Sequence, residues 1–309
     1  MIAGVDIGGT KVALGLIDSN GAVVTRVDIP IEVDRGPANA RDRMLKVMRQ
    51  LNQQATGGFK GIGIGCTGPI DAITGEMGDV NTLPGWQGWN PMRELADEFK
   101  VTVALENDAD AAALGEARWG AGKGRRSMIG LTVGTGIGAG IIFEGKVYRG
   151  AGNAHPEIGH HIMEPDGPLC TCGATGCWEA LAAGPSIEQW YAEQNPEGGA
   201  RTCKEICEFA RKGDAAAQRA VDRLARYLGI GLSNVIHMLM PEVIALSGSV
   251  MQSADLLLDP IRAIVRNNCR VVPSENCLIT LSSLGANAGL IGAAQVWHTR
   301  FDSEHKEKL

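Results

Sequence analysis

The stretch GVDIGGTK (Gly4–Lys11) ends an apolar segment with one carboxylate, two glycines, a hydroxyl and a lysine. A related stretch, LTVGTGIGAG (Leu131–Gly140), repeats the apolar segment and the glycines but lacks the carboxylate and the lysine. Glycines allow backbone N–H groups to point into a concavity that fits an anion, and they leave no side chain in the way. We therefore interpret the two stretches as two halves of one device that holds the phosphates of a nucleotide.

Each residue type in these stretches suits a phosphate site. Thr10 and Lys11 can donate to phosphate oxygens, and Asp6 can hold Mg²⁺, which prefers a few carboxylates together with phosphates and water. The alternative is an ordinary glycine hairpin with a solvated lysine, since neither stretch is a Walker A loop or a dinucleotide fingerprint. The residues expected to bind ATP phosphates and magnesium are Asp6, Gly8, Gly9, Thr10, Lys11, Gly134, Thr135 and Gly136.

The order of expected elements around these stretches predicts an internally duplicated α/β fold. A strand, a glycine turn, a second strand and a hairpin turn occur twice, so that Gly8 falls on Gly134 and Asp18 falls on Glu144. Short β-hairpins are common and share turn residues, so chance is the alternative explanation. A chain of 309 residues has the length for two domains packed around a shared cleft.

Composition narrows the functional class. The net charge is -6 and the basic residues form no long stripe, which argues against a nucleic-acid partner. No stretch is long and apolar enough to cross a bilayer, and the N-terminus lacks the features of a signal peptide, so we expect a cytoplasmic protein without a membrane partner. In a reducing compartment the eight cysteines are expected to be thiols or metal ligands rather than disulfides.

The segment ENDAD (Glu106–Asp110) places an amide and carboxylates between an expected strand and an expected helix. Asn107 is a favourable N-cap, and acidic residues in the first turn suit the helix dipole. The sharper alternative is that Asp108 accepts the proton of an acceptor hydroxyl while Asn107 orients the acceptor. The residues alone favour the cap.

A loop rich in cysteine carries the spacing H-x9-C-x-C-x4-C, formed by His160, Cys170, Cys172 and Cys177. Four such ligands in a short loop suit a closed, tetrahedral, structural Zn²⁺ site that leaves no position open for substrate. His161 is a neighbouring alternative ligand. The other interpretation is three thiols without a metal beside an unrelated histidine.

Four motifs, DIGGTK, LTVGTGIGAG, EIGHH and CTCGATGCWE, together resemble the ROK family of repressors, open reading frames and sugar kinases. The resemblance covers essentially the whole chain. It implies the duplicated ribonuclease-H-like fold of actin and hexokinase, with ATP and sugar meeting in a cleft between two lobes. The implied lobes are residues 1–109 with 295–309, and residues 110–294.

The resemblance also implies roles for individual residues. It implies phosphorylation of a hexose at O6 by ATP and Mg²⁺, with Asp108 as general base, Asn107 orienting the sugar and Gly248 near the adenosine. It makes the four residues of the cysteine loop zinc ligands. The implied sugar-binding residues are Gly68, Asn81, Asn107, Asp108, Glu157, His160 and Glu179.

More detailed resemblances within the family predict the sugar acceptor and the oligomeric state. TLPGW (Thr82–Trp86) resembles the glucokinase branch of the family, so glucose is the expected acceptor, whereas HPEIGH (His155–His160) also occurs in fructokinase-like relatives. N-acetylmannosamine, N-acetylglucosamine and fructose are the alternatives. A repressor of the family needs a helix-turn-helix that reads DNA. The first expected strand begins at Ile2, so we do not expect this protein to be a repressor. Family members are commonly dimers or tetramers, which predicts a homodimer or a homotetramer here.

Overall fold

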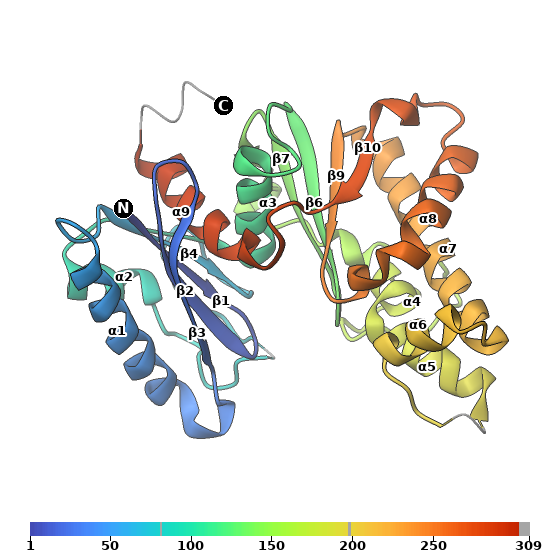
Figure 1. Ribbon diagram of the computed structural model, residues 1–309, viewed down its shortest axis with the longest axis horizontal. Helices are drawn as coiled ribbons and strands as arrows, with labels where there is room; N and C mark the ends of the chain where they lie inside the picture. The colour runs from blue at the N-terminus through green and yellow to red at the C-terminus, as the bar shows by residue number, and fades with distance from the viewer. Residues whose placement is uncertain (81, 197–198, 303–309) are drawn as a thin grey trace. The chain divides into compact units, whose positions relative to one another are not determined.

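The computed structural model describes residues 1–80, 82–196 and 199–302 (Figure 1). The chain packs into two compact units. The first contains residues 1–126, 140–148 and the chain from 283 onward, and the second contains residues 127–139 and 149–282. These units are defined by packing, and the functional lobes expected from the sequence, residues 1–109 with 295–309 and residues 110–294, stay a prediction.

The first sheet has the strand order β3-β2-β1-β4-β5. Its first three strands form two antiparallel pairs, whereas β4 lies parallel to both β1 and β5. The carboxyl ends of β1, β4 and β5 therefore meet at one edge of the sheet. The strands are β1 (Ile2–Ile7), β2 (Lys11–Ile17), β3 (Val23–Pro30), β4 (Gly61–Cys66) and β5 (Val103–Asn107).

The second sheet has the strand order β10-β9-β6-β7-β8. If β6 to β10 are matched in turn to β1 to β5, this is the order of the first sheet read from its other edge. Strand β9 is parallel to β6 and to β10, and β7 is antiparallel to β8. Glycine turns join β1 to β2 and β6 to β7 at matching places, so the predicted duplication is confirmed. The strands are β6 (Ser127–Val133), β7 (Ile137–Phe143), β8 (Lys146–Val147), β9 (Val243–Ser247) and β10 (Leu278–Leu281).

The two faces of the first sheet are packed in different ways. Alternate residues of β4, such as Ile62 and Ile64, join a hydrophobic core that includes Met44 and Met48 of helix α1 (Gly36–Gln54). Helix α2 (Pro91–Phe99) adds Leu95 to the same core.

On the opposite face, glycines of β1 and β4 stand where side chains would otherwise project, so helices can approach the backbone closely. A Cβ on Gly63 would lie 1.7 Å from the carbonyl oxygen of Ala293, in α9 (Ala288–Phe301). Helix α3 (Asp108–Trp119) packs beside α9 on this face, and a Cβ on Gly292 would lie 1.9 Å from the oxygen of Ala111. The C-terminal helix is thus an integral part of the first unit.

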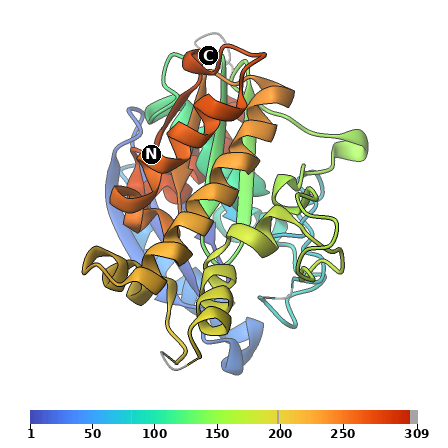
Figure 2. The same cartoon turned by 90° about the vertical axis from the view of Figure 1, so that its right-hand side faces the viewer.

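The helices of the second unit pack around α7 (Ala215–Leu239), which contacts each of the others. Helices α7 and α8 (Ala254–Asn268) lie side by side (Figure 2). Among the residues that the structure describes, no helix combines the length and the apolar character that crossing a membrane requires. The remaining helices of this unit are α4 (Trp178–Ala182), α5 (Gly184–Gln194) and α6 (Cys203–Arg211).

Candidate functional site

Two predicted site residues of the first unit, Asp6 and Asp108, meet at the carboxyl ends of its parallel strands. Asp6 lies opposite Gly65 of β4, and Gly65 lies opposite Glu106 of β5. A Cβ on Gly65 would lie 3.8 Å from Oδ1 of Asp6 and 3.7 Å from Cα of Asp108. The carboxyl edge of a parallel sheet is where α/β proteins bind ligands, so this pair is well placed for substrate chemistry.

The charge of Asp6 is costly in this position. Burial and then the nearby charge of Asp108 raise the pKa of Asp6 to about 6 from an ordinary value of 3.8, against the opposing charges of Arg26 and Lys11. Lys11 is exposed, and its ammonium group donates to Asp28 over 3.3 Å. A bound cation would stabilise the ionised form of Asp6, which suits its predicted role as a Mg²⁺ ligand.

Gly289 contacts this site, although no pattern in the sequence indicated it. A Cβ on Gly289, in the first turn of α9, would lie 2.3 Å from Oδ2 of Asp6. Arg26 fixes the start of the same helix, because it donates to the oxygen of Ala286 over 2.6 Å and to the side chain of Asn287 over 2.7 Å. The contact joins the two ends of the chain, so no local sequence signal could have revealed it.

Asn107 performs the capping role that its position predicts. Its Oδ1 accepts from the backbone N–H of Ala109 at 2.9 Å and of Asp110 at 3.3 Å. Its Nδ2 faces Gly68, where a Cβ would lie 3.5 Å away. Asp108 is the first residue of α3. Capping thus uses the oxygen of Asn107 and leaves its amide nitrogen directed toward another residue of the predicted sugar-binding set.

The first glycine turn closes with a hydrogen bond from the N–H of Gly8 to the oxygen of Lys11, at 3.0 Å. A Cβ on Gly9 would lie 2.8 Å from Cβ of Thr82, so the TLPGW segment lies against this turn. Thr10 is exposed at the tip. Asn81, the predicted sugar ligand that precedes Thr82, lies outside the described residues.

The second glycine turn and Gly248 lie together in the second unit. The N–H of Gly134 donates to the oxygen of Gly136 at 2.9 Å, and Thr135 is exposed at the tip. Gly248 has φ of 95° and its Cβ position lies 2.2 Å from the oxygen of Val133, so any side chain there would be strained and would clash. The structure thus brings the two predicted nucleotide segments of this unit into contact.

His160, Cys170, Cys172 and Cys177 converge in the second unit, with their ligand atoms all within 4.8 Å of one another. Cys170 Sγ lies 3.5 Å from His160 Nδ1, and Cys172 Sγ lies 3.6 Å from Cys177 Sγ. A tetrahedral zinc site with bonds of about 2.0–2.3 Å has ligand separations of about 3.3–3.8 Å, which these distances match. The four residues fit a metal ion.

The other histidines near the metal loop have different partners. Nδ1 of His161 faces the oxygen of Ile158, its Nε2 lies 3.5 Å from Asn234, and its ring packs on Trp178 at 5.3 Å. His155 contacts Arg149 at 3.0 Å. His160 is therefore the histidine of the cluster, and the alternative His161 is not part of it.

The two glutamates beside the metal loop differ in their surroundings. Glu157 is exposed and precedes the 3-10 turn η3 (Ile158–His160). Glu179, in contrast, accepts the backbone N–H of Ile137 at 2.8 Å, at the start of β7. No local pattern indicated this bond between α4 and the second glycine turn.

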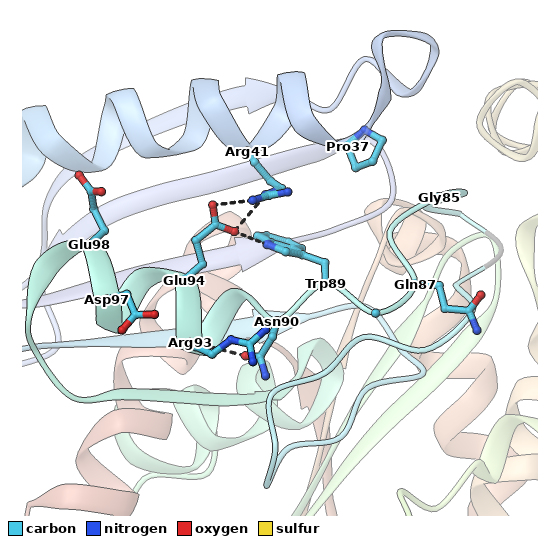
Figure 3. Close-up of a pocket in the computed structure, with 11 residues that line it drawn as sticks. Pro37, Arg41, Gly85, Gln87, Trp89, Asn90, Arg93, Glu94, Asp97 and Glu98 are labelled. Atoms are coloured by element: carbon cyan, nitrogen blue, oxygen red, sulfur yellow. Dashed lines mark hydrogen bonds and ion pairs between the residues drawn. The ribbon is translucent and has the colours of Figure 1, made fainter.

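A surface pocket of about 670 Å³ lies beside α1 and α2 in the first unit (Figure 3). Glu94 occupies its centre and accepts from Arg41 at 2.8 and 3.0 Å and from the indole N–H of Trp89. None of the predicted site residues that the structure describes lines it. This group fixes the chain between the TLPGW segment and α2.

The predicted site residues thus form two sets, one in each unit. The first unit holds Asp6, Gly8, Gly9, Thr10, Lys11, Gly68, Asn107 and Asp108. The second holds Gly134, Thr135, Gly136, Glu157, His160, Cys170, Cys172, Cys177, Glu179 and Gly248.

Comparison with known proteins gives consistent relatives. The glucokinase of Thermotoga maritima is 30% identical over 311 residues, which cover 96% of each chain. The ROK hexokinase of Thermus thermophilus is 34% identical, with a TM-score of 0.82 over 96% of this chain and 97% of that one. A ROK family glucokinase of Streptomyces griseus, solved with glucose and AMPPNP, is 32% identical, with a TM-score of 0.79 over 96% and 98% of the two chains.

These structural neighbours have the fold of actin and hexokinase, as expected from the sequence motifs. The ROK family pattern matches residues 2–300, which is nearly the whole chain. The protein belongs to the ROK family.

Proposed function

We propose that this protein transfers the γ-phosphoryl group of ATP to O6 of a hexose, and that the hexose is glucose. The broader assignment, an ATP-dependent sugar kinase, agrees with family membership and with relatives named glucokinase and hexokinase at 30 to 34% identity. The choice of glucose draws on the relatives' names and on the TLPGW segment. The observation that carries the proposal is the pairing of Asp6 and Asp108 beside Gly65.

We assign a separate task to each carboxylate. Asp108 accepts the proton of the sugar O6 hydroxyl as the oxygen attacks the γ-phosphorus, and the amide of Asn107 orients the ring. Asp6 holds Mg²⁺, which supplies positive charge to the phosphates when bound. Transfer of a phosphoryl group depends mainly on positioning and charge neutralisation, so a carboxylate in a helix first turn is a sufficient base.

The remaining residues of the proposal act by binding. The backbone of Gly8–Lys11 and of Gly134–Gly136 receives the phosphates, and Gly248 receives the adenosine. Gly68, Asn81, Glu157, His160 and Glu179 complete the sugar site. We assign Zn²⁺ to the cysteine loop, where closed coordination gives it a structural role. The functional form is proposed to be a homodimer or a homotetramer.

The test is an ADP-release assay with a panel of acceptors: glucose, N-acetylmannosamine, N-acetylglucosamine and fructose. We expect ADP release to depend on sugar, with the highest kcat/KM for glucose. Asp108→Asn should lower kcat at least about a hundredfold while glucose still binds, as judged by calorimetry. Release of ADP that does not depend on any sugar would refute the kinase, and near-normal turnover of Asp108→Asn would refute the assigned base.

A further inference from the structure

Glu179 connects three functional segments of the second unit. It lies in α4, two residues after the metal-loop residue Cys177. Its Oε2 accepts the N–H of Ile137 at 2.8 Å, at the first residue after the glycine turn. Its Oε1 lies 3.4 Å from the hydroxyl of Thr171, which stands between two cysteines of the metal loop.

The glycine turn packs directly against this carboxylate. A Cβ on Gly136 would lie 2.4 Å from Oε2 of Glu179, so the turn and the carboxylate fit together only because residue 136 has no side chain. A second bond reinforces the same contact, because the N–H of Gly184 donates to the oxygen of Gly134 at 2.7 Å. Two hydrogen bonds thus tie α4 and the residue that begins α5 to the two ends of the turn.

The charge of Glu179 argues against a direct role in binding phosphate. A carboxylate repels an anionic ligand, whereas a carboxylate that accepts a backbone N–H can fix the backbone that binds the anion. Bonds with an ionised acceptor are roughly twice as strong as neutral ones, so Glu179 is a strong constraint on the turn.

We propose that Glu179 is a positioning residue for the nucleotide: its carboxylate holds the turn between β6 and β7 in the shape that binds phosphate and ties that shape to the metal loop. The inference rests on the proposed function, because it takes this turn as a phosphate site. It adds a role to Glu179 beyond contact with sugar. It requires that nucleotide affinity depend on Glu179 even when no sugar is present.

The experiment measures binding of Mg²⁺·AMPPNP to the full-length protein by calorimetry, without sugar. We expect Glu179→Ala to bind about tenfold more weakly than the wild type, since a charge-assisted bond is lost. Glu179→Gln keeps an acceptor of the same size but no charge, and should bind about three- to fivefold more weakly. Glu193→Ala, which removes an exposed carboxylate of α5, is the control and should bind as the wild type does.

Kinetics provide a second readout that a general loss of folding would not reproduce. Glu179→Gln should raise the KM for ATP more than it lowers kcat, with an unchanged melting temperature. Wild-type affinity in both Glu179→Ala and Glu179→Gln would overturn the inference and leave the residue with a sugar contact alone. Failure of the wild type itself to bind AMPPNP would instead refute the proposed function.

Discussion

Replacement of Asp6 by asparagine should make the protein more stable while it removes activity. Burial and the charge of Asp108 raise the pKa of Asp6 from 3.8 to about 6. The folded protein therefore holds this proton more tightly than the unfolded chain does. A rise of about two pKa units lowers the free energy of unfolding by about 3 kcal/mol at a pH where the carboxyl is ionised in both the folded and the unfolded state.

The sign gives this effect a distinctive dependence on pH. Well below pH 3.8 the carboxyl is protonated in both states and does not affect stability, and the cost to stability grows as pH rises from there to about 6 and then levels off. The asparagine side chain of the variant is neutral throughout and has nearly the same size. The Asp6→Asn variant should therefore exceed the wild type in unfolding free energy by about 3 kcal/mol at pH 8, about 1.6 at pH 5 and about 0.5 at pH 4.

The assay is urea unfolding of both proteins from pH 4 to pH 8, with EDTA present so that no Mg²⁺ stabilises the wild type. Asp34→Asn, which neutralises an exposed aspartate, is the control and should show no comparable trend. A difference between Asp6→Asn and the wild type that stays constant with pH would refute the reasoning. So would a variant that is less stable at pH 8.

Three further substitutions test other parts of the site. Cys172→Ser should lose the bound metal, measured by mass spectrometry of the purified protein. It should also melt at a lower temperature, because the three ligands that remain do not hold the loop closed. Gly289→Ala should raise the Mg²⁺ concentration for half-maximal activity about tenfold, because the added methyl group displaces the carboxylate of Asp6. Glu94→Ala should lower the unfolding free energy by about 1–3 kcal/mol, because it removes the common acceptor of two partly buried donors, whereas Glu98→Ala should have little effect.

Clear outcomes would contradict each of these expectations. Full metal content in Cys172→Ser would exclude that residue as a ligand, and Cys203→Ser, outside the cluster, is its control. An unchanged Mg²⁺ requirement in Gly289→Ala would show that Asp6 tolerates displacement or does not bind the ion. Equal effects of Glu94→Ala and Glu98→Ala would show that the central acceptor in Figure 3 contributes no more than a surface ion pair.

The duplicated fold could be predicted because its signals are local. Glycine turns mark the strand ends in both halves, and the first strand begins at Ile2 as the sequence predicts. Helix α2 was not predicted, although Asn90 caps it by accepting the N–H of Arg93 and a proline begins it. Its short amphipathic run follows a loop rich in turn residues, which hides the start of the helix.

The grouping of the cysteine loop was predictable from the sequence, whereas the contacts around the other candidate site residues were not. The spacing of the cysteine loop identified four residues that the structure brings together. The steric fit of Gly289 to Asp6 and the bond of Glu179 to Ile137 were beyond prediction, because both depend on how distant segments pack. The assigned roles of Asp108, Asn107 and Gly68 remain predictions for the experiments above.

The place of α9 has a consequence for how the protein is made. The first unit is complete only when α9 lies against β4 and α3, with backbone contacts that its glycines make possible. During synthesis this helix leaves the ribosome after every residue of the second unit. The glycine-lined face of the N-terminal sheet is therefore covered by α3 but not by α9 until the end of synthesis, and a chain that ends before residue 288 would lack the backbone contacts that complete the first unit.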